Sequence, residues 1–177
     1  MCIRDRLKVA PEHCVSSVLD YMGKPHFDVF LKFWRQYQKL NEEGGTEQYL
    51  VPYLMSSHPG CTLSDAVELA EFLHKNGRTP EQVQDFYPTP GTLSTCMYYT
   101  GIDPRDMSEV YVARDPKEKA MQRALLQWSR PEKRALVVEA LEETGRTDLI
   151  GYEKKCLIRP RKGEPYGCLL YTSPSPR

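Results

Sequence analysis

The sequence lacks the features that mark a membrane-spanning protein, a nucleic-acid-binding protein or a disulfide-stapled scaffold. Its 24 Lys and Arg residues balance 24 Asp and Glu residues, so no charge excess points to nucleic acid or to a membrane surface. No apolar run approaches the roughly 20 residues that a membrane-spanning helix needs. None of the six cysteines forms a Cys-x-x-Cys pair, which favours neither a zinc ribbon nor a disulfide framework. These absences predict a reducing, cytoplasmic location.

The two ends of the chain are predicted not to belong to the natural protein. One DNA sequence that encodes CLLYTS (168–173) also encodes Met-Cys-Ile-Arg-Asp on its opposite strand, and the chain begins with that pentapeptide. A single DNA element of the kind used in sequencing-library adaptors therefore accounts for both ends of the chain. The segments 1–6 and 168–177 are predicted to derive from such an adaptor, so the fold is predicted from the residues between them. Without them, 21 Lys and Arg stand against 23 Asp and Glu, a net charge of −2. We expect a fragment of a longer gene whose ends make few contacts with the core.

Between these ends, apolar strands alternate with helices. Runs with strand character occur at 7–10, 48–55 and 82–87, and segments with helical spacing of apolar residues separate them. This order predicts an α/β fold with three adjacent parallel strands and right-handed crossovers. We expect the strand at 7–10 to be buried, and the strand at 48–55 to be buried on both faces because its run is continuously apolar.

Two helices are predicted between the first two strands, and one after the second strand. The helix at 15–22 is short, and the next extends from 27 to 43 before Gly44-Gly45 ends it. Thr62 and Asp65 form a capping box for the third helix. The apolar face of the helix at 27–43 is expected in the core, as is the later pair Tyr98-Tyr99. This face consists of Phe27, Phe30, Leu31, Trp34 and Tyr37.

The character of the chain changes after Gly101. Asp115 followed by Pro116 is a strong helix start, and Ser129 to Glu132 resembles a second capping box. We therefore predict a helical hairpin at 115–145. The expected organisation is an α/β part at 7–101, a helical extension at 102–158 and a linker at 159–167.

Each predicted strand ends in a polar tip that contains proline. The segments read LKVAPEH (7–13), QYLVPYLMSSHPG (48–60) and QVQDFYPTPGT (82–92). Proline lacks an N–H donor and stops a hydrogen-bond ladder. Because α/β folds bind ligands at the carboxyl ends of their parallel strands, the three tips predict a ligand site.

These three segments resemble the YgiQ family of radical-SAM proteins. YMGKP (21–25), EKAMQRALLQW (118–128) and DLIGYEKKCLI (148–158) extend the resemblance over nearly all of 7–158. It implies the C-terminal half of a radical-SAM barrel, a partial parallel (βα) barrel followed by a C-terminal helical hairpin. It also implies an enzyme that binds a [4Fe-4S] cluster and S-adenosylmethionine and generates a 5′-deoxyadenosyl radical. The substrate is not identified.

One departure from the family limits what this chain can do alone. The Cys-x-x-x-Cys-x-x-Cys cluster motif is absent, and in such barrels it precedes the segment that corresponds to Leu7. Without three thiolates the cluster cannot be held, so we expect the fragment itself to be inactive. The strand edge left open by missing strands should also favour aggregation.

The resemblance implies cofactor contacts at the first two tips. Glu12 and His13 would meet the ribose or the amino-acid part of S-adenosylmethionine, since a carboxylate accepts hydrogen bonds from hydroxyl and ammonium groups. The alternative is a pair that satisfies backbone amides at a helix N-terminus. The second tip would pack beside the adenine. It offers Ser56, His58, Pro59 and Gly60, where glycine permits close backbone approach and the histidine is alternatively a hydrogen-bonded structural residue.

The third tip and the cysteines leave further alternatives open. Phe86 and Tyr87 would cover the adenine, or pack in the core at a strand end. Cys14, Cys61 and Cys96 each follow a different tip and with the two histidines make a conceivable metal site, but their spacing is irregular and we predict none.

Two other function classes are a non-catalytic α/β interaction module and a metal-assisted hydrolase. The hydrolase would use His13 and His58 with Glu12. The predicted partner is a small-molecule cofactor, with no membrane and no clear nucleic-acid signal.

Overall fold

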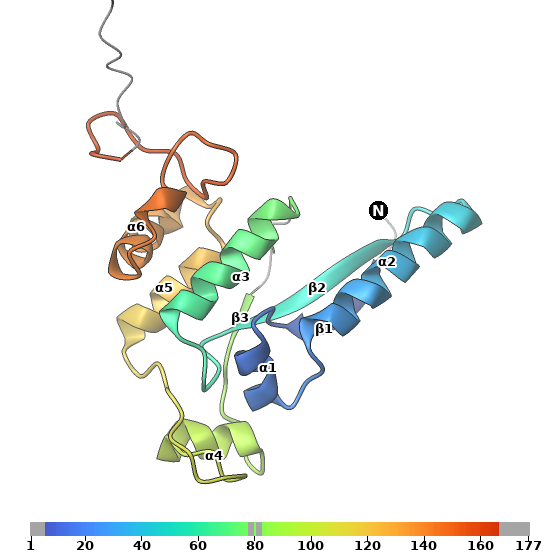
Figure 1. The fold of residues 1–177 in the computed structure, drawn as a ribbon, viewed down its shortest axis with the longest axis vertical. Coiled ribbons are helices and arrows are strands. Elements are labelled where there is room, and N and C mark those ends of the chain that lie inside the picture. Colours follow the sequence, from blue (N-terminus) through green and yellow to red (C-terminus); the bar gives the residue numbers. More distant parts are fainter. Residues whose placement is uncertain (1–5, 78–79, 81–82, 167–177) are drawn as a thin grey trace, which may run out of the picture.

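The computed structural model describes residues 6–77, 80 and 83–166 (Figure 1). Three parallel strands form one sheet in the order β1-β2-β3, which confirms the predicted α/β arrangement. The strands are β1 (Arg6–Glu12), β2 (Tyr49–Ser56) and β3 (Val83–Asp85). The sheet of the described residues has three strands, and its extension to a partial barrel remains a prediction. Of the two expected terminal segments, 1–5 and 168–177 lie outside the described residues, whereas Arg6 begins β1 and pairs with Tyr49.

Six α-helices accompany the sheet in the described part of the chain. They are α1 (Ser16–Met22), α2 (Phe27–Gly44), α3 (Leu63–Lys75), α4 (Leu93–Thr100), α5 (Pro116–Leu126) and α6 (Arg134–Glu143). Short 3₁₀ turns at Pro131–Lys133 and Thr147–Leu149 flank α6. No helix within the described ranges is both long and apolar enough to cross a membrane.

Local capping chemistry explains where two of these helices begin. Thr62 and Asp65 form the predicted capping box of α3: the Asp65 N–H donates to Thr62 Oγ1, and the Thr62 N–H donates to Asp65 Oδ2 over 2.8 Å. Asp115 caps α5 by accepting the Lys117 N–H. The second predicted capping box is wrong, because Pro131 starts a 3₁₀ turn before α6, and no side chain caps either element.

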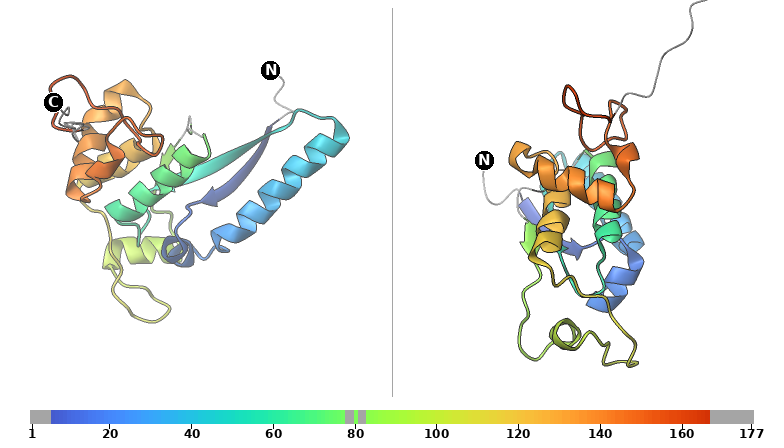
Figure 2. Two further views of the ribbon diagram at one scale, coloured as in Figure 1. Left: turned by 45° about the horizontal axis from the view of Figure 1, so that its top comes forward. Right: turned by 90° about the vertical axis from the view of Figure 1, so that its left-hand side faces the viewer.

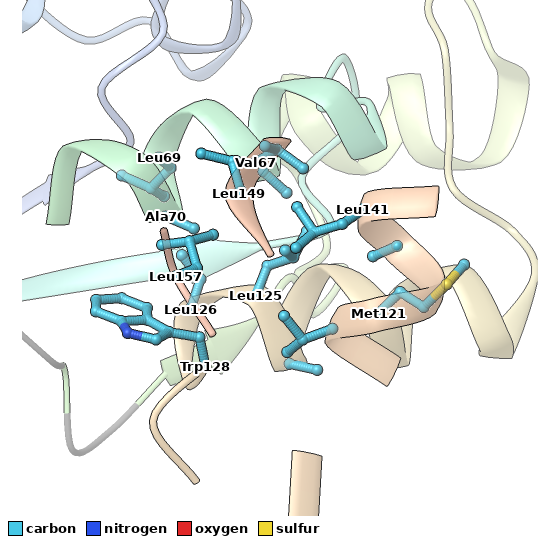
Figure 3. Packing of buried hydrophobic residues seen from close by; sticks show 14 of the residues in the cluster. Val67, Leu69, Ala70, Met121, Leu125, Leu126, Trp128, Leu141, Leu149 and Leu157 are labelled. Carbon is cyan, nitrogen blue, oxygen red and sulfur yellow. The ribbon is translucent and has the colours of Figure 1, made fainter. Parts of the chain in front are cut away.

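The core lies where α3, α5 and α6 meet, together with the segment 149–158 (Figure 3). α5 contacts α3, α6, β2 and β3, so it is the central helix. α5 and α6 form the expected helical hairpin. The core side chains are apolar and almost fully buried; those labelled in Figure 3 are Val67, Leu69, Ala70, Met121, Leu125, Leu126, Trp128, Leu141, Leu149 and Leu157.

The strands are less buried than their sequences predict. β1 is exposed at four of its seven positions, with Leu7 41% exposed, so the expected buried strand is wrong. β2 alternates: Leu50 and Leu54 are buried, whereas Tyr49 and Tyr53 are exposed. A continuously apolar strand can thus have one face covered and the other open, since side chains alternate between the faces of a sheet.

α2 also departs from the prediction, because none of its residues is buried. Its predicted apolar face is the half-buried side, so the pattern identified the correct face but not a core. The helix lies along the β1–β2 end of the molecule, away from α6 (Figure 2). Near one end of the helix the Phe27 ring meets Phe72 of α3 edge-on at 4.8 Å, and near the other end Asn41 Nδ2 donates to the Gln48 carbonyl over 2.9 Å.

Candidate functional site

The predicted strand tips meet at one edge of the sheet. Glu12 pairs with Leu54, and Ser56 pairs with Asp85, so the carboxyl ends of all three strands are neighbours. The Phe86 N–H donates to the Ser56 carbonyl over 2.8 Å and extends the β2–β3 pairing into the third tip. The sequence therefore predicted the relative position of these tips correctly.

The backbone at two of these tips adopts an uncommon conformation. Glu12 has φ 62° and Ser57 has φ 60°, in the left-handed region that glycine favours. For other residues this conformation costs about 1 kcal/mol or more. The register shift between Val9 and Glu12 is an irregularity of the kind that redirects side chains at sheet edges. Such backbone outliers cluster at functional sites, so these two positions are candidates for one.

Glu12 forms an ion pair at the end of β1. Its Oε1 lies 2.8 Å from Nζ of Lys24, which also donates to the Ala10 carbonyl. The carboxylate does not cap α1, because the N-cap of that helix is Val15 and no side chain caps it. The Glu12 side chain is 18% exposed, so part of it is accessible to a ligand.

His13 is buried and uses both ring nitrogens within the protein. Nδ1 accepts the Val15 N–H over 3.1 Å, so the neutral ring carries its proton on Nε2, 3.6 Å from Sγ of Cys61. Burial lowers the pKa of His13 to about 4, although the nearby Asp65 charge opposes this. Burial also raises the pKa of the Cys61 thiol. The pair is therefore neutral near pH 7, a packed imidazole and thiol rather than an ion pair.

His58 connects the tip of β2 to α4. Its Nδ1–H donates to the Pro59 carbonyl over 2.7 Å, which leaves Nε2 to accept the Ser94 hydroxyl over 2.9 Å. Burial lowers its pKa, and the ring edge packs against Phe86 at 5.1 Å. These contacts agree with the hydrogen-bonded structural alternative for His58.

Gly60 allows a close approach, and the neighbour is a side chain of this chain. It has φ 87°, and a Cβ added there would stand 2.1 Å from the Tyr21 ring of α1. Its N–H donates to the Tyr111 carbonyl over 2.7 Å. Pro59 before it is buried. The glycine is thus required to pack α1 against the loop after β2.

The aromatic residues of the third tip differ in exposure. Phe86 is half-buried between the rings of His58 and Tyr98, so the core-packing alternative fits it. Tyr87 is 77% exposed and its ring is accessible. The expectation that Tyr98 and Tyr99 are core is wrong: Tyr98 is half-buried and Tyr99 is 65% exposed, because α4 buries only Met97.

Sequence reasoning missed the residue that holds the loop after β2. Gln122 of α5 is fully buried; its Oε1 accepts the Ser57 N–H over 3.0 Å, and its Nε2 donates to the Cys61 carbonyl over 3.2 Å. Nε2 also lies 3.2 Å from Glu118. The sequence did contain one indication of this role: Gln122 directly follows Met121 in EKAMQRALLQW, and Met121 is buried in the core.

Two polar features beside that loop were also missed. Ser56 Oγ donates to Asp85 Oδ1 over 2.6 Å, and Asp85 Oδ2 pairs with Arg123 at 3.0 Å. Ser57 Oγ is buried and has no hydrogen-bond partner among the described residues. A buried hydroxyl without a partner is unfavourable, and a ligand group or water at the tip would satisfy it.

The cysteines do not assemble a metal centre in the described part of the chain. No group of three or more potential His, Cys, Asp or Glu ligands occurs there. Cys96 is exposed on α4, and Cys14 is half-buried with a pKa that burial raises to about 12. A raised pKa disfavours the thiolate that binds metals.

A family comparison covers the second half of this structure. The family model described as "Domain of unknown function (DUF3362)" matches residues 81–173, just over half of the chain. The chain belongs to the DUF3362 family. The matched residues include α4, α5 and α6, and so the DUF3362 region contains both Gln122 and Arg123.

Longer similarities extend beyond the DUF3362 region. A UPF0313 protein of Clostridium perfringens is 55% identical over 159 residues, which is 90% of this chain and 24% of the relative. A UPF0313 protein of Methanosarcina mazei is 54% identical over 160 residues, which is 90% of this chain and 26% of the relative. One of Clostridium botulinum is 56% identical over 156 residues, which is 88% of this chain and 24% of the relative. The chain thus spans about a quarter of the length of the curated relatives it matches. No solved structure matches it significantly.

UPF0313 proteins are the YgiQ-type family, so these similarities agree with the resemblance at the level of the family. They state no function for the relatives. The radical-SAM part of the resemblance stays a prediction.

Proposed function

We propose that the full-length protein containing this chain is a radical-SAM enzyme, and that the strand tips described above face the adenosine part of S-adenosylmethionine. The observation that carries the proposal is the meeting of three parallel strand tips at one edge, two of them with a left-handed non-glycine residue. Ligands of α/β folds bind at this end of a parallel sheet.

The tips offer groups that suit S-adenosylmethionine. The partly exposed Glu12 carboxylate is an acceptor for ribose hydroxyl or ammonium donors, although Lys24 already occupies one of its oxygens. Ser57 Oγ lacks a partner within the described residues and would gain one from a polar group at the tip. The exposed Tyr87 ring has the flat apolar surface on which an adenine stacks. These three residues fit the cofactor in part.

The described residues do not fit a [4Fe-4S] cluster. Such a cluster needs three protein thiolates at least, and the described residues supply no suitable group of ligands. The ligands would have to come from other parts of a full-length protein about four times as long. In radical-SAM chemistry the bound cluster and cofactor together supply a 5′-deoxyadenosyl radical. This chain's own contribution would be binding and orientation of the adenosine.

The direct test uses a full-length relative, such as the UPF0313 protein of Clostridium perfringens. Iron and sulfide are reconstituted anaerobically, dithionite and S-adenosylmethionine are added, and 5′-deoxyadenosine is measured. The proposal expects product from the full-length protein and none from this 177-residue chain. A cluster-loaded full-length protein that forms no product would contradict the enzyme class, and product from the chain alone would contradict the dependence on missing ligands.

Two variants separate cofactor binding by Glu12 from its ion pair. Glu12→Gln, introduced in the full-length protein, removes the charged acceptor and the pair, whereas Lys24→Met removes the pair and leaves the carboxylate. If Glu12 binds the cofactor, Glu12→Gln should weaken S-adenosylmethionine binding about tenfold, the size expected for one charge-assisted hydrogen bond. Lys24→Met should then preserve binding. Equal weakening in both variants would show that Glu12 acts only through Lys24.

The contacts of the histidines bear on the hydrolase alternative. Both nitrogens of His13 and of His58 are engaged by hydrogen bonds within the protein, and metal ligation would break one at each site. The geometry therefore favours the cofactor proposal. An interaction module would need none of the strained tips, and it predicts that Glu12→Gln changes no small-molecule binding.

A further inference from the structure

β2 divides its side chains between the two faces of the sheet, because successive residues of a strand point in opposite directions. Leu50, Leu54 and Ser56 are buried on one face. The residues that alternate with them lie on the other face, where two tyrosines are 50% and 37% exposed and the other two side chains are half-buried. We call these four residues the apolar row: Tyr49, Val51, Tyr53 and Met55.

The connecting helices lie on the face opposite the apolar row. The chain crosses from β1 to β2 through α1 and α2, and from β2 to β3 through α3, so both steps run in one direction across the sheet. Because crossovers between parallel strands are almost always right-handed, two such steps place their helices on the same face. Figure 2 shows α2 and α3 on one side of the strands. Leu54 belongs to the same buried cluster as Val67 and Leu69 of α3, so the helices cover the face of Leu54.

The second face has the composition of an interface. Sheets made only of parallel strands occur almost exclusively in folds that cover both faces. Both strand pairs here are parallel, and the apolar row on the second face is partly exposed. Lys8 of β1 lies beside Val51 and Gln84 of β3 lies beside Met55, and both of these polar residues are exposed. An apolar centre with a polar rim is typical of a surface that contacts protein.

We propose that the apolar row is an internal interface of the full-length protein, covered by apolar side chains from outside this chain. The Clostridium perfringens relative matches 90% of this chain with only 24% of its own length, so about three quarters of such a protein is available to cover the row. A segment tethered in the same polypeptide has a high effective concentration, which favours it over a second copy or a separate protein. The inference requires neither cofactor nor cluster, so it does not rest on the proposed function.

The proposal accounts for the sequence of β2. YLVPYLM (49–55) is apolar or aromatic at every position, whereas a strand with one face in water usually alternates apolar and polar residues. A second layer over the apolar row buries both sets of side chains. It restores the burial on both faces that the sequence predicts, and it explains why this chain alone leaves one set exposed.

The test is hydroxyl-radical footprinting read by mass spectrometry, applied to the 177-residue chain and to the purified full-length protein that contains it. Tyr49 and Tyr53 should be labelled in the chain and should lose most of their labelling in the full-length protein. The full-length protein unfolded in urea provides the fully labelled reference. The matched control is Tyr152, which is 71% exposed and lies outside the sheet, so it should stay labelled in both proteins.

Three outcomes would overturn the proposal. Full labelling of Tyr49 and Tyr53 in the full-length protein would mean that no part of the same polypeptide covers the apolar row. Equal protection of Tyr152 would mean that the shielding is not specific to the row. The 177-residue chain is also footprinted over a range of concentrations, and protection that appears as the concentration rises would assign the row to a second copy.

Tyr49→Glu provides an independent measurement. A charge at a covered position is unfavourable, whereas a charge at a half-exposed position can stay in water. The substitution should therefore lower the midpoint of thermal unfolding more in the full-length protein than in the 177-residue chain. Tyr152→Glu is the matched control and should shift both midpoints little. An equal shift by Tyr49→Glu in the two proteins would contradict a covered row.

Discussion

Two regions of this molecule have similar apolar patterns and different burial. In the helical core, formed by α3, α5, α6 and residues 149–158, apolar faces pack against one another and are almost fully excluded from water. In the outer arm, formed by β1 and α2, the apolar residues stay half-buried or exposed. α2 is the longest helix described, yet it buries no residue, whereas the shorter α6 buries three.

This difference shows what an amphipathic pattern can establish. The spacing of apolar residues determines which face of a helix turns toward the protein. How much of that face is covered depends on how many layers surround it, and this is a property of the whole fold. α5 has neighbours on several sides, namely α3, α6 and the sheet. α2 has no residue that is fully covered, so the same kind of face remains half-buried.

The strongest test of the comparison is one substitution made in both regions. Leu141→Ala in α6 removes a fully buried side chain, and Leu40→Ala in α2 removes one that is 55% exposed. The first should lower the free energy of unfolding by about 2–5 kcal/mol through lost burial and a cavity. The second should change it by about 0.5 kcal/mol or less. Urea denaturation measures both, and similar losses would mean that the arm is packed as tightly as the core.

The next largest effect should depend on pH. The folded-state pKa of His13 is about 4, below the ordinary value of 6.5, so the unfolded chain takes up the proton first as pH falls. The stability from neutral His13 is present above pH 6.5 and is lost between pH 6.5 and 4, by about 3 kcal/mol at most. His58, whose pKa burial also lowers, adds in the same direction.

His13→Asn tests this pH dependence, since the amide oxygen can still accept the Val15 N–H. Urea unfolding between pH 7 and 4 should show a shallower loss of stability in the variant. The control His26→Asn changes an exposed histidine that pairs with Asp20 and should retain most of the loss. An unchanged slope in His13→Asn would contradict the buried neutral imidazole.

Gln122→Leu should have an intermediate effect. It leaves the Ser57 N–H and the Cys61 carbonyl without their buried partner, which should cost about 2 kcal/mol. Hydrogen exchange of the Ser57 amide should accelerate in the same variant. The control Gln36→Leu lies on the exposed side of α2. If both variants unfold at the same urea concentration, Gln122 does not hold the loop.

The smallest effect should come from removing a helix cap. Thr62→Val abolishes the hydroxyl that caps α3 and should lower the free energy of unfolding by about 1 kcal/mol. Thr92→Val removes the cap of α4, which buries only Met97, so fraying of that helix should affect global unfolding less. Urea denaturation of both proteins provides the comparison; a larger loss for Thr92→Val would reverse the expected order.

Local chemistry made part of this structure predictable. Thr62, Asp65 and Asp115 act on residues two or three positions away, so their caps could be identified from the sequence alone. The parallel order of β1, β2 and β3 followed from alternation along the chain. The exposure of Tyr99 and of α2 could not be predicted in the same way, because it depends on which distant segments cover them.

In the candidate site, too, local features could be predicted from the sequence, whereas contacts between distant segments could not. The three strand tips were predictable because each ends an apolar run at a proline-containing segment. The partners of their side chains were not: Gln122 is 65 positions from Ser57 in the sequence, and Ser94 is 36 positions from His58. Only the fold brings such pairs within hydrogen-bond distance.

Gln122 and its neighbour Arg123 connect α5 to two of the strand tips. Gln122 holds the loop that begins at Ser57, and Arg123 holds Asp85 at the end of β3. Adjacent residues of one helix turn therefore contact the tips of two strands. A substitution in this turn of α5 can thus alter the surroundings of both tips, although neither residue belongs to a strand.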